Sequence, residues 1–382
     1  MMLDTTLLRS IEVTPTQWQL MTRLFLPWTL LCMIGVVMVG SASIATASDH
    51  LTKHVIYLLA GGAGLLISVY IPTVVLQKLS WVAWALAMIV CVAVLVPGVG
   101  YEVNGARRWL RISGFSVQAA EVAKLGVGVF MAAYLARHRQ QLATSPAALL
   151  LPIGLSMLIC MLLVAEPDLG SAVVIFTAVA GLAYVAGAKL RYFLALVLLG
   201  AAAVYLLIEL APYRMARMVA FLDPWAVAFG SGYQLTQALI AFGRGELWGL
   251  GLGESIQKLF YLPEAHNDFI FAVIAEELGA VGVIAVALLF TWLVVQIFNF
   301  GKQCGERQHL FAAYFTYFTG LVFALQFLIN LGVNTGALPT KGLTLPFVSY
   351  GGNSLMVSCV MLGIVVRCVI ESDQPRRTRR RT

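Results

Sequence analysis

The chain has 382 residues, of which 60% are hydrophobic and only 11% are charged, and its mean hydropathy is +0.88. Soluble domains carry about 25% charged residues, so this composition excludes an ordinary soluble domain and predicts a polytopic membrane protein. The net charge is +7, and five arginines gather in residues 376–381. We interpret this basic tail as a cytoplasmic flank that touches anionic membrane lipid. It is not accompanied by a folded basic domain, so nucleic-acid binding is not predicted.

Ten apolar segments are long enough to cross a membrane, at about 20 residues per helix. They lie at about 24–45, 54–74, 80–97, 116–136, 147–165, 169–187, 192–210, 268–298, 310–332 and 345–368. With the N-terminus inside, 15 of the 25 Lys and Arg residues fall on the inner side and nine on the outer side. This bias predicts cytoplasmic tails at 1–23 and 371–382, a membrane core at 24–370, and an outer loop at 211–267.

The outer cations are concentrated near Trp109, Tyr213, Trp225 and a glycine-rich loop, or just before the last span. Outer Lys and Arg residues are disfavoured by the insertion machinery, so their clustering suggests an anionic ligand at the outer membrane face. The alternative is pairing with outer carboxylates. Those carboxylates include Glu102, Asp223, Glu246 and Glu254.

Three polar stretches interrupt the spans before the large loop. NGARRWLRI at 104–112 combines arginines with an interfacial tryptophan, which suits either a phosphate ligand or plain headgroup anchoring. In QAAEVAK at 118–124, Glu121 and Lys124 are three residues apart within a span, so they form a structural ion pair or face a cavity. AEPDLGSA at 165–172 places Glu166 and Asp168 outside, where Asp168 could cap the following helix.

The large loop ends in PEAHNDFIF at 263–271, where Asp268 precedes a long apolar helix. Asn267 or Asp268 could be a helix cap and nothing more. Function is favoured because Glu264 and His266 crowd the same turn, because outer cations are available, and because a carboxylate there can take a proton from a hydroxyl. Further along, Pro residues in PTKGLTLPFVSYGGNSL at 339–355 break regular structure around Lys341.

Five stretches together resemble the SEDS family of cell-wall polymerases, in order and over nearly the whole membrane core. They are NGARRWL, AEPDLGSA, GSGYQLTQALIAFGRGELWGLGLG, LPEAHNDFIFAVIAEELG and LPTKGLTLPFVSYGGNSL. PYRMARMVAFLDPW and LPEAHNDFIF are more similar to the division branch of the family than to its elongation branch. Two positions depart from the family pattern. His266-Asn267-Asp268 stands where the family usually has His-Thr-Asp, and Gln118-Ala119-Ala120-Glu121 stands where it often has Gln-Pro-Ala-Glu.

The resemblance implies an all-α membrane fold of about ten helices, with a large extracytoplasmic loop between helices 7 and 8. It implies a peptidoglycan glycosyltransferase that polymerises lipid II on the periplasmic side of the bacterial inner membrane, at the division septum. The family's essential aspartate falls on Asp268, which would act as the general base of an inverting transfer. The candidate substrate-binding residues are Arg107, Arg108, Arg214, Arg217, Arg244, Lys258, His266, Lys341, Glu121 and Lys124.

The resemblance also implies a class B penicillin-binding protein as partner, an FtsI-like transpeptidase, together with other division proteins. The sequence indicates no cofactor and leaves the use of a divalent cation open. Two other functions remain open from the residues. One is a transporter that flips the lipid-linked precursor, and the other is a non-catalytic scaffold of the division apparatus.

Overall fold

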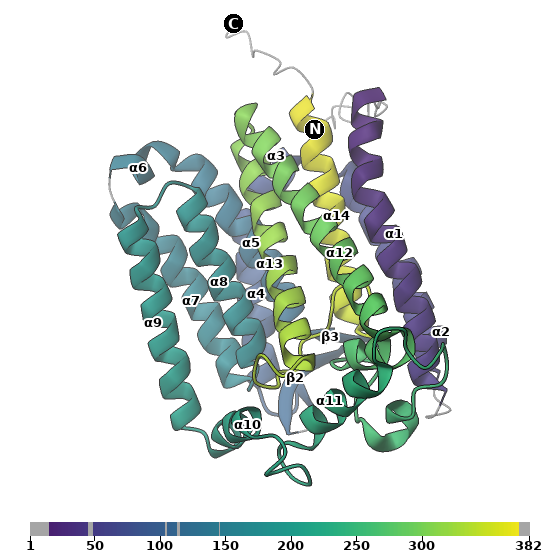
Figure 1. Cartoon of the computed structure of the whole chain (residues 1–382). Helices are drawn as coiled ribbons and strands as arrows, with labels where there is room; N and C mark the ends of the chain where they lie inside the picture. Colours follow the sequence, from purple (N-terminus) through teal and green to yellow (C-terminus); the bar gives the residue numbers. More distant parts are fainter. Residues whose placement is uncertain (1–14, 45–48, 104, 113–114, 145, 374–382) are drawn as a thin grey trace, which may run out of the picture.

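The computed structural model describes residues 15–44, 49–103, 105–112, 115–144 and 146–373, which form a bundle of long helices (Figure 1). A segment in lipid must satisfy its backbone hydrogen bonds internally, so the apolar segments of this chain become helices. The bundle helices are α1 (Pro15–Ser43), α2 (His50–Tyr70), α4 (Ser80–Leu95), α5 (Ala119–Arg137), α7 (Leu150–Ala165), α8 (Leu169–Val185), α9 (Leu190–Glu209), α12 (Ile270–Glu306), α13 (Leu310–Asn334) and α14 (Gly352–Asp373). Short helices α3 (Thr73–Lys78), α6 (Arg139–Thr144) and η2 (Pro146–Leu149) lie in connections.

The ten bundle helices correspond one to one with the ten predicted spans. Within the described residues, seven are long and apolar enough to cross a membrane, and α4, α7 and α8 are shorter apolar helices. The boundaries differ at both ends of the chain. α1 begins at Pro15, inside the predicted tail, and α14 begins only at Gly352. Residues 335–351 stay irregular because Pro339 and Pro346 lack the amide hydrogen that a helix needs.

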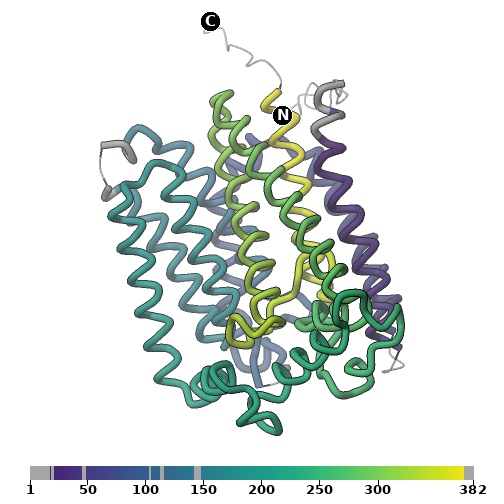
Figure 2. The backbone as a smooth tube through the Cα atoms, viewed as in Figure 1, coloured from purple at the N-terminus to yellow at the C-terminus, as the bar shows by residue number. Residues whose placement is uncertain are grey.

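α13 lies at the centre of the bundle, where it packs against α5, α8, α12 and α14. Its phenylalanines supply much of the core, and Phe315, Phe318 and Phe323 are fully buried. α9 lies at the edge of the bundle (Figure 2), and none of the residues of its apolar window is buried. A helix that is apolar and exposed along its length is suited to contact with lipid.

A small antiparallel sheet departs from the all-helical expectation. β1 (Gly100–Val103), β2 (Ala106–Ile112) and β3 (Phe115–Gln118) pair in that order, with Trp109 of β2 opposite Tyr101 and Gln118. Aromatic and β-branched residues favour strands, and Gly105, with φ of 74°, provides the left-handed backbone of the first turn. The predicted span at 116–136 therefore starts later, because residues 115–118 belong to β3.

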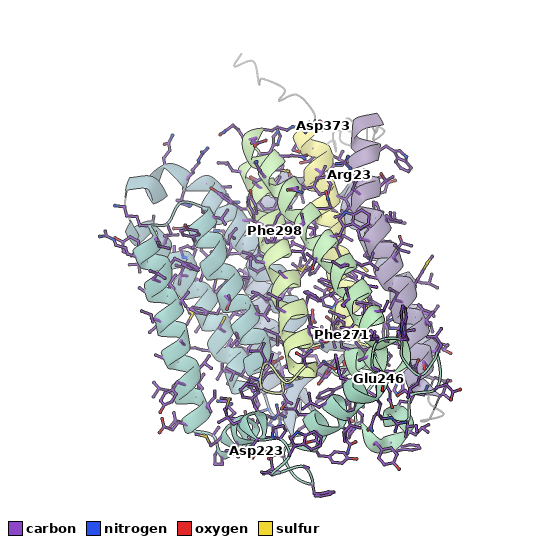
Figure 3. The ribbon with its side chains drawn as sticks, in the orientation of Figure 1. Arg23, Asp223, Glu246, Phe271, Phe298 and Asp373 are labelled. Carbon is purple, nitrogen blue, oxygen red and sulfur yellow. The ribbon has the colours of Figure 1, made fainter. Side chains whose placement is uncertain are left out.

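The large loop lies at the opposite end of the bundle from the start of α1 and the end of α14. Figure 3 shows Asp223 and Glu246 at the loop end, and Arg23 and Asp373 at the other. The loop contains α10 (Pro212–Leu222), α11 (Tyr233–Gly245) and the single turn η3 (Gln257–Tyr261). The two ends of the described chain thus lie on the same side, as the predicted topology requires.

The large loop is hydrogen-bonded to the bundle at a break in α12. Gly279 has φ of 67° and ψ of −169°, which interrupts the helical hydrogen bonds. The freed carbonyls of Glu276 and Glu277 accept hydrogen bonds from the backbone amides of Leu250 (2.9 Å) and Gly251 (3.0 Å). The side chains of both glutamates are buried as well, so the loop is held by backbone and side chain together.

Candidate functional site

Asp268 lies in the turn that leads into α12, three residues before Phe271, which Figure 3 labels toward the loop end of the bundle. Phe269 occupies the N-cap position of α12, and its side chain makes no capping hydrogen bond. The alternative that Asn267 or Asp268 serves as the helix cap is therefore wrong. The acceptor comes instead from α13, where Asn334 Oδ1 accepts a hydrogen bond of 3.1 Å from the amide of Ala272.

The Asp268 side chain is partly buried, and its carboxylate makes no hydrogen bond to any residue that the structure describes. Burial raises the pKa of this carboxyl to about 7, and the charge of Glu264 acts in the same direction. The cations Arg108 and Arg217 oppose that rise. A carboxylate with a pKa near the working pH is suited to general-base catalysis, because it is ionised often enough and still basic.

The charges of two cations, Arg108 and Arg217, act on the Asp268 carboxylate, and the same two act on Lys341. Lys341 is partly buried in the irregular segment before α14, and burial lowers its pKa to about 8. Repulsion by Arg217, Arg214 and Arg108 contributes in the same direction, which places each of these three arginines within electrostatic reach of Lys341. The four cations come from three separate parts of the chain, β2, α10 and the 335–351 segment. Such a concentration of positive charge is suited to bind a diphosphate.

Arg108 is held by backbone carbonyls. On the middle strand of the sheet, its guanidinium donates to the carbonyl oxygens of Glu166 (3.2 Å) and Pro167 in the turn between α7 and α8. Glu166 is fully buried, and burial followed by the charge of Asp168 raises the pKa of its carboxyl to about 8. Near pH 7 this group is mostly protonated, so it leaves the charge of Arg108 available.

Asp168 caps α8, as the sequence suggested. Its carboxylate accepts hydrogen bonds from the amide (3.2 Å) and the hydroxyl (2.9 Å) of Ser171. Arg214 is also buried and fixed, with its guanidinium donating to the carbonyl of Leu207 (2.8 Å). Arg217 is exposed on the next turn of α10. Arg108 and Arg214 are therefore pre-oriented, whereas Arg217 is placed at the surface of the site.

His266 lies in an aromatic group beside Asp268. Its ring stacks on His50 with ring centroids 4.2 Å apart, and it meets Tyr350 edge to face at 5.4 Å. Burial, together with the proximity of His50, lowers the pKa of His266, while Glu264 opposes the shift. The backbone carbonyl of His266 also accepts the amide of Tyr350 at 2.9 Å. This arrangement connects the Asp268 turn to the segment before α14.

Five of the predicted binding residues are engaged in ion pairs. Arg107 pairs with Glu102 at 3.2 Å on the exposed edge of the sheet, and Arg244 pairs with the buried Glu276 at 3.2 Å. Lys258 is buried and pairs with Glu277 at 2.7 Å. Lys124 and Glu121 pair with each other at 2.7 Å within the first turns of α5, which agrees with the structural alternative raised from the sequence.

The buried Lys258 pair fastens the loop to α12. The ammonium of Lys258 also donates to the hydroxyl of Ser41 and to the carbonyl of Gly253. A buried charge that is compensated in this way is committed to the fold and is not free to bind a phosphate. Lys258 and Arg244 are therefore better understood as residues that hold the loop.

Sequence reasoning missed two residues of the site, Asn330 and Asn334. Both are buried on α13, and both donate a side-chain hydrogen bond to the backbone carbonyl of Asp268, at 3.1 and 3.0 Å. The available signal was the spacing, because two amides four residues apart in an apolar helix lie on one face. Within the described residues, no group of three or more His, Cys, Asp or Glu side chains is placed to hold a metal ion.

Comparison with known proteins decides the family. A family model of cell cycle proteins that covers FtsW, RodA and SpoVE matches residues 21–374. The chain belongs to this family. The resemblance to SEDS polymerases that the sequence indicated is thereby confirmed, and the match includes all ten bundle helices apart from the first turns of α1.

Two relatives lie on the FtsW side of the FtsW/RodA/SpoVE family. The chain is 45% identical over 356 residues to the probable peptidoglycan glycosyltransferase FtsW of Alcanivorax borkumensis, which covers 91% of this chain and 92% of the relative. It is 41% identical over 358 residues to the probable peptidoglycan glycosyltransferase FtsW of Coxiella burnetii, covering 91% of this chain and 96% of the relative. This agrees with the predicted similarity to the division branch.

Solved structures of the same family share the fold. A chain of a peptidoglycan synthase complex, studied for its coordination of polymerization and crosslinking, superposes with a TM-score of 0.76 at 28% identity, covering 94% of this chain and 98% of that one. The rod shape determining protein RodA of Thermus thermophilus gives a TM-score of 0.69 at 26% identity, again over 94% and 98%. The polytopic helical core predicted from the sequence is thus the family fold.

Proposed function

We propose that the chain is a peptidoglycan glycosyltransferase that polymerises lipid II into glycan strands for the septal cell wall. One observation carries this proposal: the Asp268 carboxylate is released from helix capping, has a pKa raised to about 7, and lies within electrostatic reach of Arg108 and Arg217. A base next to a diphosphate-sized positive region is what a glycosyl transfer from a lipid diphosphate donor requires. The names of the relatives from Alcanivorax borkumensis and Coxiella burnetii support the same activity.

In the proposed reaction, Asp268 takes the proton from the acceptor sugar hydroxyl as that oxygen attacks the anomeric carbon of the donor. The new carbon–oxygen bond forms while the bond to the diphosphate breaks, and the electron pair leaves with the diphosphate. Arg108, Arg217 and Lys341 stabilise the charge that develops there. One base and one leaving group give a single displacement with inversion, unlike the paired carboxylates of retaining glycosidases.

The proposed location is the bacterial inner membrane at the division septum, with both tails cytoplasmic and the Asp268 site on the periplasmic side. The distribution of Lys and Arg residues supports this orientation. The proposed organisation is a tail at 1–23, a membrane core at 24–370 that contains the loop 211–267, and a basic tail at 371–382. The proposed partner is a class B penicillin-binding protein, in line with the synthase complex that shares this fold.

The test separates the polymerase from the transporter and the scaffold. The purified chain, reconstituted in vesicles with its transpeptidase partner and penicillin, is given labelled lipid II, and the products are separated by gel. We expect a ladder of uncrosslinked glycan strands. Movement of lipid II across the vesicle membrane without strands would favour the transporter, and neither strands nor movement would favour the scaffold.

A further inference from the structure

Two asparagines on α13 hold the turn that carries Asp268. Asn330 and Asn334 are 2% and 0% exposed in a helix that is otherwise largely apolar. The amide nitrogen of each donates to the backbone carbonyl of Asp268, at 3.1 Å from Asn330 and 3.0 Å from Asn334. An unpaired amide is costly to bury, so hydrogen bonds that satisfy both groups fix their geometry firmly.

The oxygen of Asn334 has a second function, because it accepts the amide of Ala272 at 3.1 Å in the first turn of α12. A helix N-terminus presents free amides, and the side chain that satisfies them is most often Asp, Asn, Ser or Thr just before the helix. Asp268 is adjacent to this position and would be a natural cap. Asn334 supplies the acceptor from the neighbouring helix, and the Asp268 carboxylate is left uncommitted.

Asn330 also reaches the segment that carries Lys341. Its amide nitrogen donates to the carbonyl of Leu343 at 2.6 Å. In the same segment, a Cβ built on Gly342 would lie only 2.9 Å from Asp268 Oδ2, so the carboxylate lies beside this segment with no room for a side chain at residue 342. One side chain thus ties both the base and the lysine segment to α13.

We propose that Asn330 and Asn334 are positioning residues for the base, which keep the Asp268 carboxylate out of the N-cap of α12 and in register with the Lys341 segment. This inference rests on the proposed function, in which Asp268 is the general base. The physical reason is that helix capping would make the Asp268 carboxylate a weaker base. A carboxylate that accepts backbone amide hydrogen bonds is stabilised in its charged form, so its pKa falls and it takes a proton less readily.

Four charged residues outside α13 act on the Asp268 carboxyl. Glu264 on the same turn and Asp168 at the start of α8 disfavour the ionised form, whereas Arg108 on β2 and Arg217 on α10 favour it. All four remain in place when α13 is changed. A shift in the titration of Asp268 in an α13 variant therefore reports the loss or gain of a contact from α13 itself.

The experiment compares Asn334→Ala with Asn334→Asp in the intact chain with its partner. Alanine removes the cap acceptor, so we expect the Asp268 side chain to turn to the N-terminus of α12. We then expect kcat to fall about tenfold while KM stays within about twofold, and the acid limb of the pH–rate profile to move down by about one pH unit. Aspartate keeps the cap acceptor and adds a negative charge beside Asp268. We expect the acid limb of that variant to move up.

Gln326→Ala is the matched control, because Gln326 is a buried amide of the same helix one turn further from the site. We expect it to leave the acid limb in place. Asn330→Ala should lower kcat, and Asn330→Gln, which keeps the amide donor, should recover part of that loss. Folding and partner binding are followed by thermal unfolding and co-purification, so that a loss of protein is not mistaken for a loss of rate.

A readout that needs no turnover keeps this inference separate from the proposed function. The protonated carboxyl of Asp268 reacts with a water-soluble carbodiimide and an amine, and mass spectrometry gives the pH midpoint of this labelling. We expect the midpoint to move down in Asn334→Ala and up in Asn334→Asp, whether or not strands are made. If Asn334→Ala does not fold, the labelling midpoint of Asn334→Asp alone tests the positioning role. An unmoved midpoint and an unmoved acid limb in the folded variants would overturn the positioning role.

Discussion

Gly342 is the residue at which a single methyl group tests the site most sharply. A Cβ at this position would lie 2.9 Å from Asp268 Oδ2 and 3.7 Å from its Cγ. Even close carbon–oxygen contacts are about 3.3–3.6 Å, so Gly342→Ala should displace the carboxylate by roughly 0.5 Å. Catalytic groups must be held within about 0.5 Å of their productive position, and a displacement of about 1 Å costs roughly 100-fold in rate. We therefore expect kcat to fall about tenfold.

The assay is the initial rate of strand synthesis from labelled lipid II, measured together with the thermal stability of the purified complex. Gly342 is exposed and its φ lies outside the left-handed region, so alanine should leave the fold intact. Gly154→Ala on α7 is the control, because a Cβ there meets nothing within 4 Å. Wild-type rates in a folded Gly342→Ala protein would refute the idea that this segment sets the position of the base.

Two further predictions concern pH and the loop. Burial raises the pKa of Asp268 to about 7, and a base acts only when it is ionised. The rate of strand synthesis should therefore increase from pH 6 and level off above pH 8, with the rate at pH 6 about a tenth of the plateau. A rate that is flat over this range would exclude such a base. Lys258→Met leaves the buried Glu277 without its cation and should lower the free energy of unfolding by about 3–5 kcal/mol. Adding Glu277→Gln should recover part of that loss in chemical denaturation. Equal stability of all three proteins would contradict the structural role of the pair.

The membrane bundle could be predicted from the sequence because length and hydropathy alone determine which segments cross a bilayer. The ten spans were found for this reason, with errors only at their ends. The sheet at residues 100–118 was not foreseen, since a short polar-aromatic segment between two spans resembles headgroup anchoring as much as a strand. Its consequence is functional, because β2 is the element that carries Arg108 to the turn between α7 and α8.

The position of Asp268 could be predicted, and the state of its carboxylate could not. Local sequence rules make an aspartate just before a helix a cap, but the N-cap of α12 falls on Phe269, and the side-chain acceptor for the Ala272 amide comes from Asn334 of another helix. The same limit applied to the cations. Lys258 and Arg108 are both outer cations in the sequence, yet one is enclosed by Glu277 and the other by two carbonyl groups. Which partner each meets is decided by packing between distant segments.

The measurement that tests the central claim most directly is strand synthesis by Asp268→Asn. Asparagine keeps the shape and an acceptor oxygen of the side chain but removes the base, and it caps a helix about as well as aspartate. General-base catalysis contributes about 100- to 10,000-fold, so we predict a folded, partner-bound protein whose strand synthesis falls by that factor. Near-normal strand synthesis by a folded Asp268→Asn complex would contradict the account, and Asp268 would no longer be the base.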